Sequence, residues 1–368
     1  MASPDKLLFT PGPLTTSATV KQAMLRDLGS RDAEFIELVR DVRRRLLALG
    51  GVSQEAGYEA IPIQGSGTFG VEAMISSVVP PQDGLLVAIN GAYGERVLTI
   101  AERHGIQTHA LRFPEDRVCD PAEIGQVLAE RPDLRQVAVV HCETTTGIMN
   151  PVAEIGAVCR AAGRTYLIDS MSAFGAVPVD LAAWGCDFLV SSSNKCIEGV
   201  PGFSFVLARR EALEATAGHA RTLSLDLAAQ WQGLEKNGQF RFTPPTHALL
   251  AFHRALDELD AEGGPEGRGA RYAENRRLLI EGMAELGIPS WLPPEVQGNV
   301  ISTFPYPDHP GFDFHELYAR LSERGFVIYP GKVTRADVFR IGSCGRLHAD
   351  DMRALLAAMK DVLAEMGL

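Results

Sequence analysis

The chain has 368 residues, of which 46% are hydrophobic, and its formal net charge at pH 7 is −11. Because no basic block interrupts this negative balance, the composition argues against a nucleic-acid-binding protein. No apolar run approaches the ~20 residues of a membrane span, and the N-terminus lacks a basic region followed by an apolar one, so we expect no secretory signal. The six cysteines include no Cys-x-x-Cys pair. This scatter predicts reduced thiols in a cytoplasmic protein, without a structural zinc site.

The first 20 residues are predicted to form an extended N-terminal segment. Two prolines in Phe9-Thr-Pro-Gly-Pro13 fix the backbone and remove hydrogen-bond donors. Thr16 or Ser17 is placed to cap a short helix, which we expect to continue to about Leu28. The apolar spacing that follows predicts an amphipathic helix over 34–49.

Short apolar runs then alternate with helix-length segments from residue 58 to about residue 208. Such alternation predicts an α/β fold with a mostly parallel, seven-stranded sheet and helices on both of its faces. The expected strands are 58–63, 85–90, 108–113, 136–141, 165–169, 188–191 and 203–208. The expected helices between them are 68–79, 94–104, 120–130 and 152–162. Ligands of such sheets bind beyond the carboxyl ends of the strands.

A run rich in glycine and proline at 261–269, after a helix expected over 246–259, has the composition of a domain boundary. We therefore divide the chain into an extended N-terminal segment (1–20), a large domain (21–262) and a smaller C-terminal α+β domain (263–368). In the small domain we expect helices over 270–286 and 313–324, strands over 299–304, 326–330 and 337–342, and a final amphipathic helix.

One glycine-rich loop, Gly65-Ser-Gly-Thr-Phe-Gly70, follows a predicted strand and opens a predicted helix. Its spacing matches the dinucleotide fingerprint, which is weak by itself. The fingerprint also requires an acidic residue at the end of the next strand, where this chain has Asn90. The loop is therefore interpreted as an anion site suited to a phosphate, with a merely tight turn as the alternative.

Two charged residues lie at strand ends on the same edge of the predicted sheet. Lys195 follows a strand in a turn of small polar residues, where a lysine can lose its proton and react with a carbonyl group. A solvated loop lysine is the simpler alternative. Asp169 ends another strand, where an aspartate either caps the next segment or pairs with a cation in a site.

A phosphate loop, a strand-end aromatic (Tyr93), Asp169 and Lys195, in this order on one parallel sheet, are typical of a pyridoxal phosphate pocket. Along its whole length the chain resembles the class V aminotransferases, which have the fold of type I pyridoxal phosphate enzymes. The motifs that carry the resemblance are Phe9-Thr-Pro-Gly-Pro13, Gly29-Ser-Arg-Asp32, Gly65-Ser-Gly-Thr-Phe-Gly70, Asn90-Gly-Ala-Tyr-Gly-Glu95, His141-Cys-Glu-Thr-Thr-Thr-Gly147, Ile168-Asp-Ser170, Ser193-Asn-Lys-Cys196 and Phe339-Arg-Ile-Gly-Ser343.

The resemblance implies pyridoxal 5'-phosphate as cofactor and assigns roles to individual residues. Lys195 would bind the cofactor covalently and carry a proton, and Asp169 would pair with the pyridine nitrogen. Arg340 would bind the anionic end of the substrate, since a guanidinium suits phosphonate and carboxylate alike, with Gly12 beside it. The implied cofactor contacts are Ser66, Gly67, Thr68, Tyr93, Thr144, Asp169, Ser193, Lys195 and Thr243.

The resemblance also implies a homodimer and a reaction. In such enzymes the second subunit contributes a Tyr and a Thr, three residues apart, to the phosphate site. This chain keeps the threonine, Thr243, but has Phe240 in place of the tyrosine. One phosphate hydrogen bond is therefore unaccounted for. The implied reaction moves the amino group of 2-aminoethylphosphonate to pyruvate. Alanine–glyoxylate or serine–glyoxylate exchange is the alternative within the family.

Other classes of protein fit the sequence less well. A nicotinamide dehydrogenase would need the missing ribose-binding carboxylate. A cysteine desulfurase would need a nucleophilic cysteine on a C-terminal loop, where only Cys344 is present, and a histidine where this chain has Tyr93. A binding protein without catalysis is not favoured, because Lys195 and Asp169 are both present.

Overall fold

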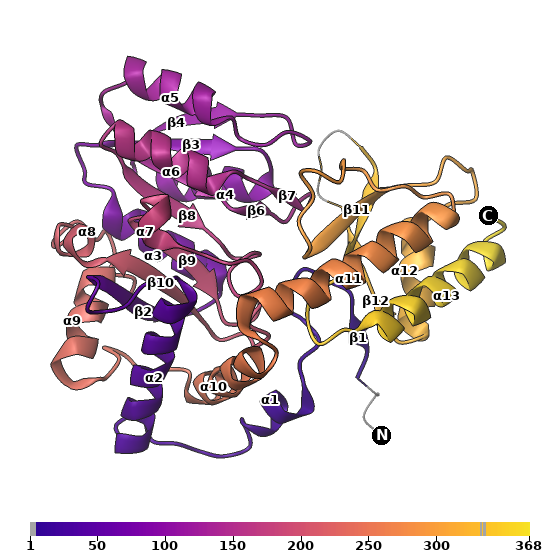
Figure 1. The fold of residues 1–368 in the computed structure, drawn as a ribbon, viewed down its shortest axis with the longest axis horizontal. Helices are drawn as coiled ribbons and strands as arrows, with labels where there is room; N and C mark the ends of the chain where they lie inside the picture. The colour runs from indigo at the N-terminus through magenta and orange to yellow at the C-terminus, as the bar shows by residue number, and fades with distance from the viewer. Residues whose placement is uncertain (1–4, 332, 334–335) are drawn as a thin grey trace.

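The computed structural model describes residues 5–331, 333 and 336–368. Residues 1–4 of the predicted N-terminal segment, and residues 332, 334 and 335 of the predicted small domain, lie outside this description. The described chain forms a large body built on a sheet and a smaller body, with helix α11 (Gly264–Glu285) extending between the two (Figure 1). None of the helices described here is long and apolar enough to cross a membrane.

The large body is built on a seven-stranded sheet with the order β2-β10-β9-β8-β5-β3-β4. Every neighbouring pair is parallel except the two that involve β10, which runs antiparallel to β2 and β9. The predicted mostly parallel, seven-stranded sheet is therefore confirmed. Its strands are β2 (Tyr58–Gln64), β3 (Gly84–Ile89), β4 (Gln107–Arg112), β5 (Leu134–Val140), β8 (Thr165–Asp169), β9 (Phe188–Ser192) and β10 (Phe203–Arg209).

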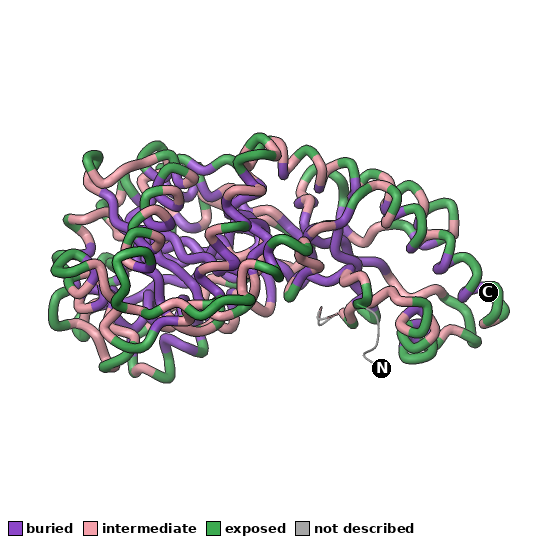
Figure 2. The backbone as a smooth tube through the Cα atoms, turned by 90° about the horizontal axis from the view of Figure 1, so that it is seen from below, coloured by how far each residue is buried: buried purple, intermediate pink, exposed green. Residues whose placement is uncertain are grey.

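Both faces of this sheet are apolar, because successive residues of a strand point to opposite sides. In β3, Leu86 and Ala88 belong to one buried cluster, and Leu85 and Val87 belong to another. Figure 2 shows the buried backbone at the centre of the wide end of the molecule. The helices that contribute most residues to the first cluster are α2 (Ala33–Leu49), α5 (Pro121–Glu130), α6 (Val152–Ala161) and α10 (Thr246–Ala261). Helices that contribute to the second are α3 (Gly67–Val78), α4 (Ala92–Arg103), α8 (Arg210–Glu214) and α9 (Leu227–Asn237).

The smaller body packs helices against a three-stranded antiparallel sheet of order β11-β14-β13. Its core includes Phe304, Phe339 and Met359, and the N-terminal segment joins it because β1 pairs in parallel with β12. Its elements are β1 (Leu7–Leu8), β11 (Ile301–Pro305), α12 (Phe314–Glu323), β12 (Phe326–Val327), β13 (Tyr329–Pro330), β14 (Val338–Gly342) and α13 (Ala349–Glu365). Two short strands, β6 (Cys142–Glu143) and β7 (Ile148–Met149), and helix α7 (Leu181–Trp184) complete the large body.

The first helix, α1 (Ala18–Gln22), is shorter than the sequence predicted. Ser17 caps it by accepting a hydrogen bond from the Val20 N–H, but the helix ends at Gln22 and does not reach Leu28. After Gln22 the N–H groups of Met24 and Leu25 bond to carbonyls three residues back, not four, so the α-helical ladder stops there. The prediction of a longer helix was therefore wrong.

Two further boundaries differ from the predictions in the C-terminal part. Helix α11 starts at Gly264, within the run predicted as a boundary, because Pro265 is favourable in a first helical turn. The single strand predicted over 326–330 is two short strands, β12 and β13, which pair with different partners. The proposed domain division between residues 262 and 263 remains a prediction.

Helix α3 lies unusually close to the sheet at Gly70. A Cβ at this position would lie 2.6 Å from Ser204 Oγ and 2.9 Å from a Val190 methyl group. Because α3 begins directly after the glycine-rich loop, this close contact fixes where the loop lies relative to the ends of β8 and β9.

Substituting Gly70→Ala should lower the free energy of unfolding by about 1–3 kcal/mol, because overpacking costs more than the gain in helix propensity. Denaturant titration measures the change. Gly125→Ala in α5 is the matched control, since its added Cβ meets one atom within 4 Å, a Val158 methyl at 3.3 Å. Equal effects of the two substitutions would show that close packing of α3 is not the cause.

Candidate active site

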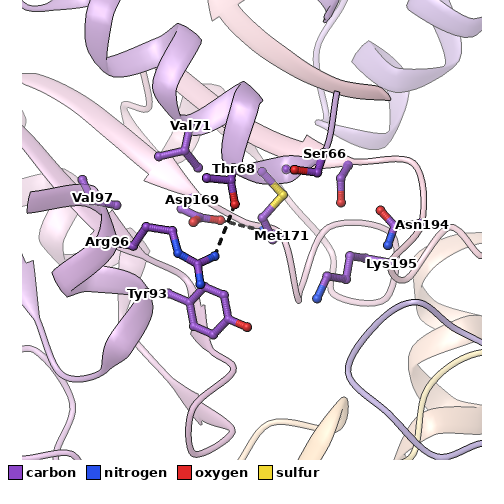
Figure 3. Close-up of a pocket in the computed structure, with 12 residues that line it drawn as sticks. Ser66, Thr68, Val71, Tyr93, Arg96, Val97, Asp169, Met171, Asn194 and Lys195 are labelled. Atoms are coloured by element: carbon purple, nitrogen blue, oxygen red, sulfur yellow. Dashed lines mark hydrogen bonds between the residues drawn. The ribbon is translucent and has the colours of Figure 1, made fainter. Parts of the chain in front are cut away.

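The candidate site lies where the parallel strands of the sheet end. Asp169 ends β8, and Lys195 lies in the turn after the adjacent strand β9. The turn is closed by the Glu198 N–H, which donates to the Lys195 carbonyl at 2.7 Å. A pocket at this edge of the sheet (Figure 3) is lined by Ser66, Gly67, Thr68, Val71, Tyr93, Arg96, Val97, Asp169, Met171, Ser192, Asn194 and Lys195. It brings together six of the residues that the sequence nominated.

The Lys195 amine is held by the N-terminal segment of the chain. Its Nζ donates a hydrogen bond to the Pro11 carbonyl at 2.6 Å. Gly12 lies so close that a Cβ there would be 3.1 Å from Lys195 Nζ, and its φ of +136° favours glycine. Gly12 therefore leaves room for the lysine; its predicted contact with substrate stays a prediction.

Asp169 is a buried carboxylate whose oxygen Oδ1 accepts a hydrogen bond from the Met171 N–H at 3.0 Å. Burial raises the pKa of Asp169 to about 6, because it disfavours the charged form. The Met171 bond and the charges of Lys195 and Arg96 oppose this increase only in part. A cation placed in the pocket would therefore be strongly stabilised by this side chain.

The N-terminus of α3 forms one wall of the pocket. Ser66 is the N-cap residue, but its hydroxyl makes no capping hydrogen bond to the helix. The first helical bonds to the Ser66 carbonyl come from Phe69 and Gly70, so the N–H groups of Gly67 and Thr68 precede the hydrogen-bonded ladder. These groups and the positive end of the helix suit an anion such as a phosphate.

Arg96 adds a positive charge that the sequence analysis missed. Its guanidinium lies 4.6 Å from the centre of the Tyr93 ring and donates to Thr68 Oγ1 at 3.3 Å. The three side chains lie together in Figure 3. The signal for Arg96 was its position three residues after Tyr93, which places both on one face of α4.

Glu143 determines where Tyr93 lies. This carboxylate is fully buried and accepts hydrogen bonds from the N–H groups of Tyr93, Gly94 and Thr145, at 3.1–3.3 Å. Burial raises the pKa of Glu143, and these donors oppose the increase. Because the N-cap residue of α4 is Gly91, which has no side chain to cap the helix, Glu143 supplies the missing acceptor from a distant strand.

Arg340, in β14 of the smaller body, is almost fully buried and does not belong to the residues that line the pocket. It donates from Nη1 to the Thr144 carbonyl at 2.8 Å and from Nε to the Pro330 carbonyl at 2.9 Å. Burial lowers the pKa of Arg340, because the neighbouring groups stabilise its positive charge only in part. An anion beside the guanidinium would stabilise this charge further.

Five nominated residues lie outside the pocket lining: Gly12 and Arg340, described above, and Thr144, Ser193 and Thr243. Thr144 shares a hydrogen bond with Ser172 through their hydroxyl oxygens, 2.9 Å apart. Ser193 donates its hydroxyl to the Val200 carbonyl at 2.7 Å, and the neighbouring Ser192 lines the pocket instead. Thr243 is exposed, and its carbonyl accepts a hydrogen bond from Gln64 at 2.6 Å.

Comparisons with known proteins agree on one family. A sequence model of the family "Aminotransferase class-V" matches residues 16–341. The 2-aminoethylphosphonate–pyruvate transaminase of Syntrophobacter fumaroxidans is 50% identical over 362 residues, which cover 98% of this chain and 97% of that protein. The solved structure of alanine–glyoxylate aminotransferase from Nostoc sp. is 27% identical, with a TM-score of 0.90, and the alignment covers 99% of this chain and 96% of that one. The ureidoglycine–glyoxylate aminotransferase of Bacillus subtilis shares the fold, with a TM-score of 0.91 at 24% identity over 100% and 95% of the two chains.

Asp169 should make the cofactor-free protein less stable as pH rises. Its folded-state pKa of about 6 lies above the unfolded value of 3.8, so the native state binds more protons between these values. Stability is therefore lost as pH rises through this interval, by at most about 3 kcal/mol. We expect Asp169→Asn to unfold at higher denaturant than the parent protein at pH 7.5, and at a similar concentration near pH 4.

Denaturant titrations at the two pH values measure this difference. Asp350→Asn, which removes a carboxylate on the surface whose side chain is 96% exposed, provides the baseline. If Asp169→Asn raises the denaturant midpoint equally at both pH values, ionisation of the Asp169 carboxylate does not destabilise the native state.

Proposed function

Since the chain belongs to the class V aminotransferases, which use pyridoxal phosphate, we propose that it transfers the amino group of 2-aminoethylphosphonate to pyruvate. The products are phosphonoacetaldehyde and L-alanine. The observation that carries this proposal is the meeting of Lys195, Asp169 and the N-terminus of α3 in one pocket. The choice of substrates is supported by the relative of that name, which is 50% identical over almost the whole chain.

The residues of the pocket fit pyridoxal phosphate. Asp169 is a buried carboxylate with a raised pKa, so it suits a protonated pyridine nitrogen. Ser66, Thr68 and Arg96 surround the N-terminus of α3, where a phosphate would be held. A Cβ at Gly67 would lie 2.5 Å from Met171 Sδ, so a larger residue there would have to displace the Met171 side chain.

Three further residues are proposed to surround the cofactor or the substrate-binding arginine. Tyr93, fixed by Glu143, would lie on the face of the ring. We assign the serine contact to Ser192, which lines the pocket, in place of Ser193. Thr144 would help to orient Arg340, because its carbonyl accepts a hydrogen bond from that side chain.

When bound, pyridoxal phosphate withdraws electrons from the carbon that carries the amino group. The chain itself must supply a base for the proton on that carbon. Lys195 is suited to this task, because its amine lies in the pocket and is oriented by the Pro11 carbonyl at 2.6 Å. Asp169 holds the proton on the pyridine nitrogen by keeping a negative charge beside it.

Substrate recognition is assigned to Arg340. Both proposed substrates carry an anion, a phosphonate in one and a carboxylate in the other, and a guanidinium binds either with two hydrogen bonds. Its two bonds to the Thr144 and Pro330 carbonyls hold the guanidinium in one orientation. Exchange between alanine or serine and glyoxylate would use the same carboxylate contact, and it remains the alternative.

We further infer a homodimer with shared sites. Thr243 does not line the pocket of its own chain, and the adjacent Phe242 is 43% exposed. Phe69, within the glycine-rich loop, is 53% exposed. Large aromatic side chains at the surface are typical of interfaces, so these two positions favour a second copy that covers the phosphate loop. A cytoplasmic location is also proposed, supported by six cysteines that are all free and buried.

The two half-reactions test the substrate assignment. Adding 2-aminoethylphosphonate to the holoenzyme should abolish its visible absorbance, and pyruvate should restore it with release of L-alanine. The alanine–glyoxylate and serine–glyoxylate pairs should have kcat/KM values lower by on the order of 10²-fold. Faster exchange with either glyoxylate pair would establish the alternative function.

Arg340→Lys keeps the positive charge but removes the two-pronged donor. We expect kcat/KM to fall about 10²-fold, or ~2.7 kcal/mol, in both half-reactions. Arg324→Lys is the control, because Arg324 is a surface residue of the same body, paired with Glu365. A loss confined to one half-reaction would mean that Arg340 binds only one of the two anions.

Mixed dimers test whether Thr243 acts in the partner's site. Chains with Lys195→Ala are co-expressed with chains that carry Thr243→Ala, and the mixed dimer is isolated. If Thr243 acts across the interface, one site carries both changes and the other carries neither, so about half of the parent activity returns. Activity no higher than that of the two single-variant dimers would place Thr243 in its own chain's site.

A further inference from the structure

Glu198 has a backbone conformation that a glycine would adopt more easily. It lies three residues after Lys195, and it is the one non-glycine residue in the described ranges with a positive φ, 65°. Its N–H closes the lysine turn on the Lys195 carbonyl. Because such a conformation costs free energy in any residue with a Cβ, the glutamate side chain must offer something that the turn requires.

The Glu198 carboxylate is buried and bonded to one helix. Its Oε1 accepts hydrogen bonds from the Tyr272 hydroxyl at 2.6 Å and from Arg271 Nη2 at 2.7 Å, and Arg268 Nη1 lies 3.5 Å away. All three partners lie on α11. A carboxylate that is 2% exposed is stable only with such partners, so the bonds fix the turn against the helix.

The same side chains of α11 also hold the segment after β14, the strand of Arg340. Arg271 Nη1 donates to the carbonyls of Gly345 and Leu347, at 2.6 and 2.9 Å. The Tyr272 hydroxyl accepts a hydrogen bond from the Gly345 N–H at 3.1 Å. Two side chains of one helix therefore connect the lysine turn to the strand of the substrate-binding arginine, in the region where α11 extends between the two bodies (Figure 1).

Glu262 provides an internal comparison for Glu198. It accepts hydrogen bonds from Nε of Arg268 and from Nε of Arg271, both at 2.6 Å. It therefore compensates the charge of the same arginines, but no hydrogen bond or ion pair found for it involves the lysine turn. Arg268 also donates from Nη1 to the Cys196 carbonyl in the lysine turn at 2.6 Å, so Glu262 acts on the turn only through this arginine, whereas Glu198 is part of the turn. An effect on the turn should therefore be larger for Glu198 than for Glu262.

We propose that Glu198 is a positioning residue for transamination, which holds the lysine turn against α11 so that Lys195 and Arg340 keep a fixed separation across the pocket. The proposal rests on the proposed roles of Lys195 and Arg340, and it does not depend on which amino donor the enzyme uses. Without the carboxylate the turn would sample other conformations, and Lys195 would reach the reacting carbon less often.

Hydrogen exchange in the cofactor-free protein tests the effect on the turn. In Glu198→Ala, backbone amides in peptides spanning Lys195–Gly199 should exchange about 10-fold faster than in the parent protein. Glu198→Gln keeps the size and one acceptor oxygen, so its exchange should be intermediate. Glu262→Ala, the matched control, should accelerate exchange in this turn clearly less than Glu198→Ala does.

Steady-state kinetics of the holoenzymes provide the second readout. Glu198→Ala should lower kcat about 10²-fold while KM for both substrates changes less than about threefold, and Glu198→Gln should recover part of kcat. Unchanged exchange in the turn, or an equal loss of kcat in Glu262→Ala, would overturn the positioning role. If Glu198→Ala does not fold, the same comparison is decided by Glu198→Gln. Failure of the parent enzyme to use 2-aminoethylphosphonate would refute the proposed function, whereas the exchange data would still decide the role of Glu198.

Discussion

The site depends on a carboxylate that the fold buries without a full countercharge. Asp169 ends β8 at the edge where the parallel strands finish, and burial raises its pKa to about 6. Glu143, also buried at this edge, has a raised pKa for the same reason. The positive groups around the pocket, Lys195, Arg96 and the N-terminus of α3, offset this cost in part. The arrangement is stable enough to fold, and it favours a ligand with a cationic ring and an anionic tail.

Segments that are distant in sequence close this pocket. The Pro11 carbonyl orients Lys195, and the Phe9 carbonyl accepts a hydrogen bond from the Gly342 N–H at the end of β14. Arg340 reaches back from β14 to the Thr144 carbonyl of the large body. The N-terminal segment and the smaller body therefore meet the sheet edge together, and α11 links them to the lysine turn.

The sequence predicted the sheet well because its strands, apart from the edge strand β4, are buried on both faces and read as largely apolar runs. β8 was predicted at its observed bounds, 165–169. The family and cofactor followed from motifs at strand ends. Contacts between residues distant in sequence could not be predicted from local patterns. Nothing in the sequence indicated that Glu143 would cap α4. Which serine faces the pocket was also undetermined, since turn geometry after β9 decides between Ser192 and Ser193. The predicted length of α1 was wrong: the cap at Ser17 marked where the helix starts, but the chain changes to turns after Gln22.

We propose above all that this pocket holds pyridoxal phosphate on Lys195. The most direct measurement is reduction of the holoenzyme with borohydride, followed by proteolysis and mass spectrometry of the peptides. The account predicts one stoichiometric adduct of reduced cofactor, located on Lys195 within the turn after β9. An adduct on another lysine, or a protein that remains unmodified although cofactor is bound, would contradict it.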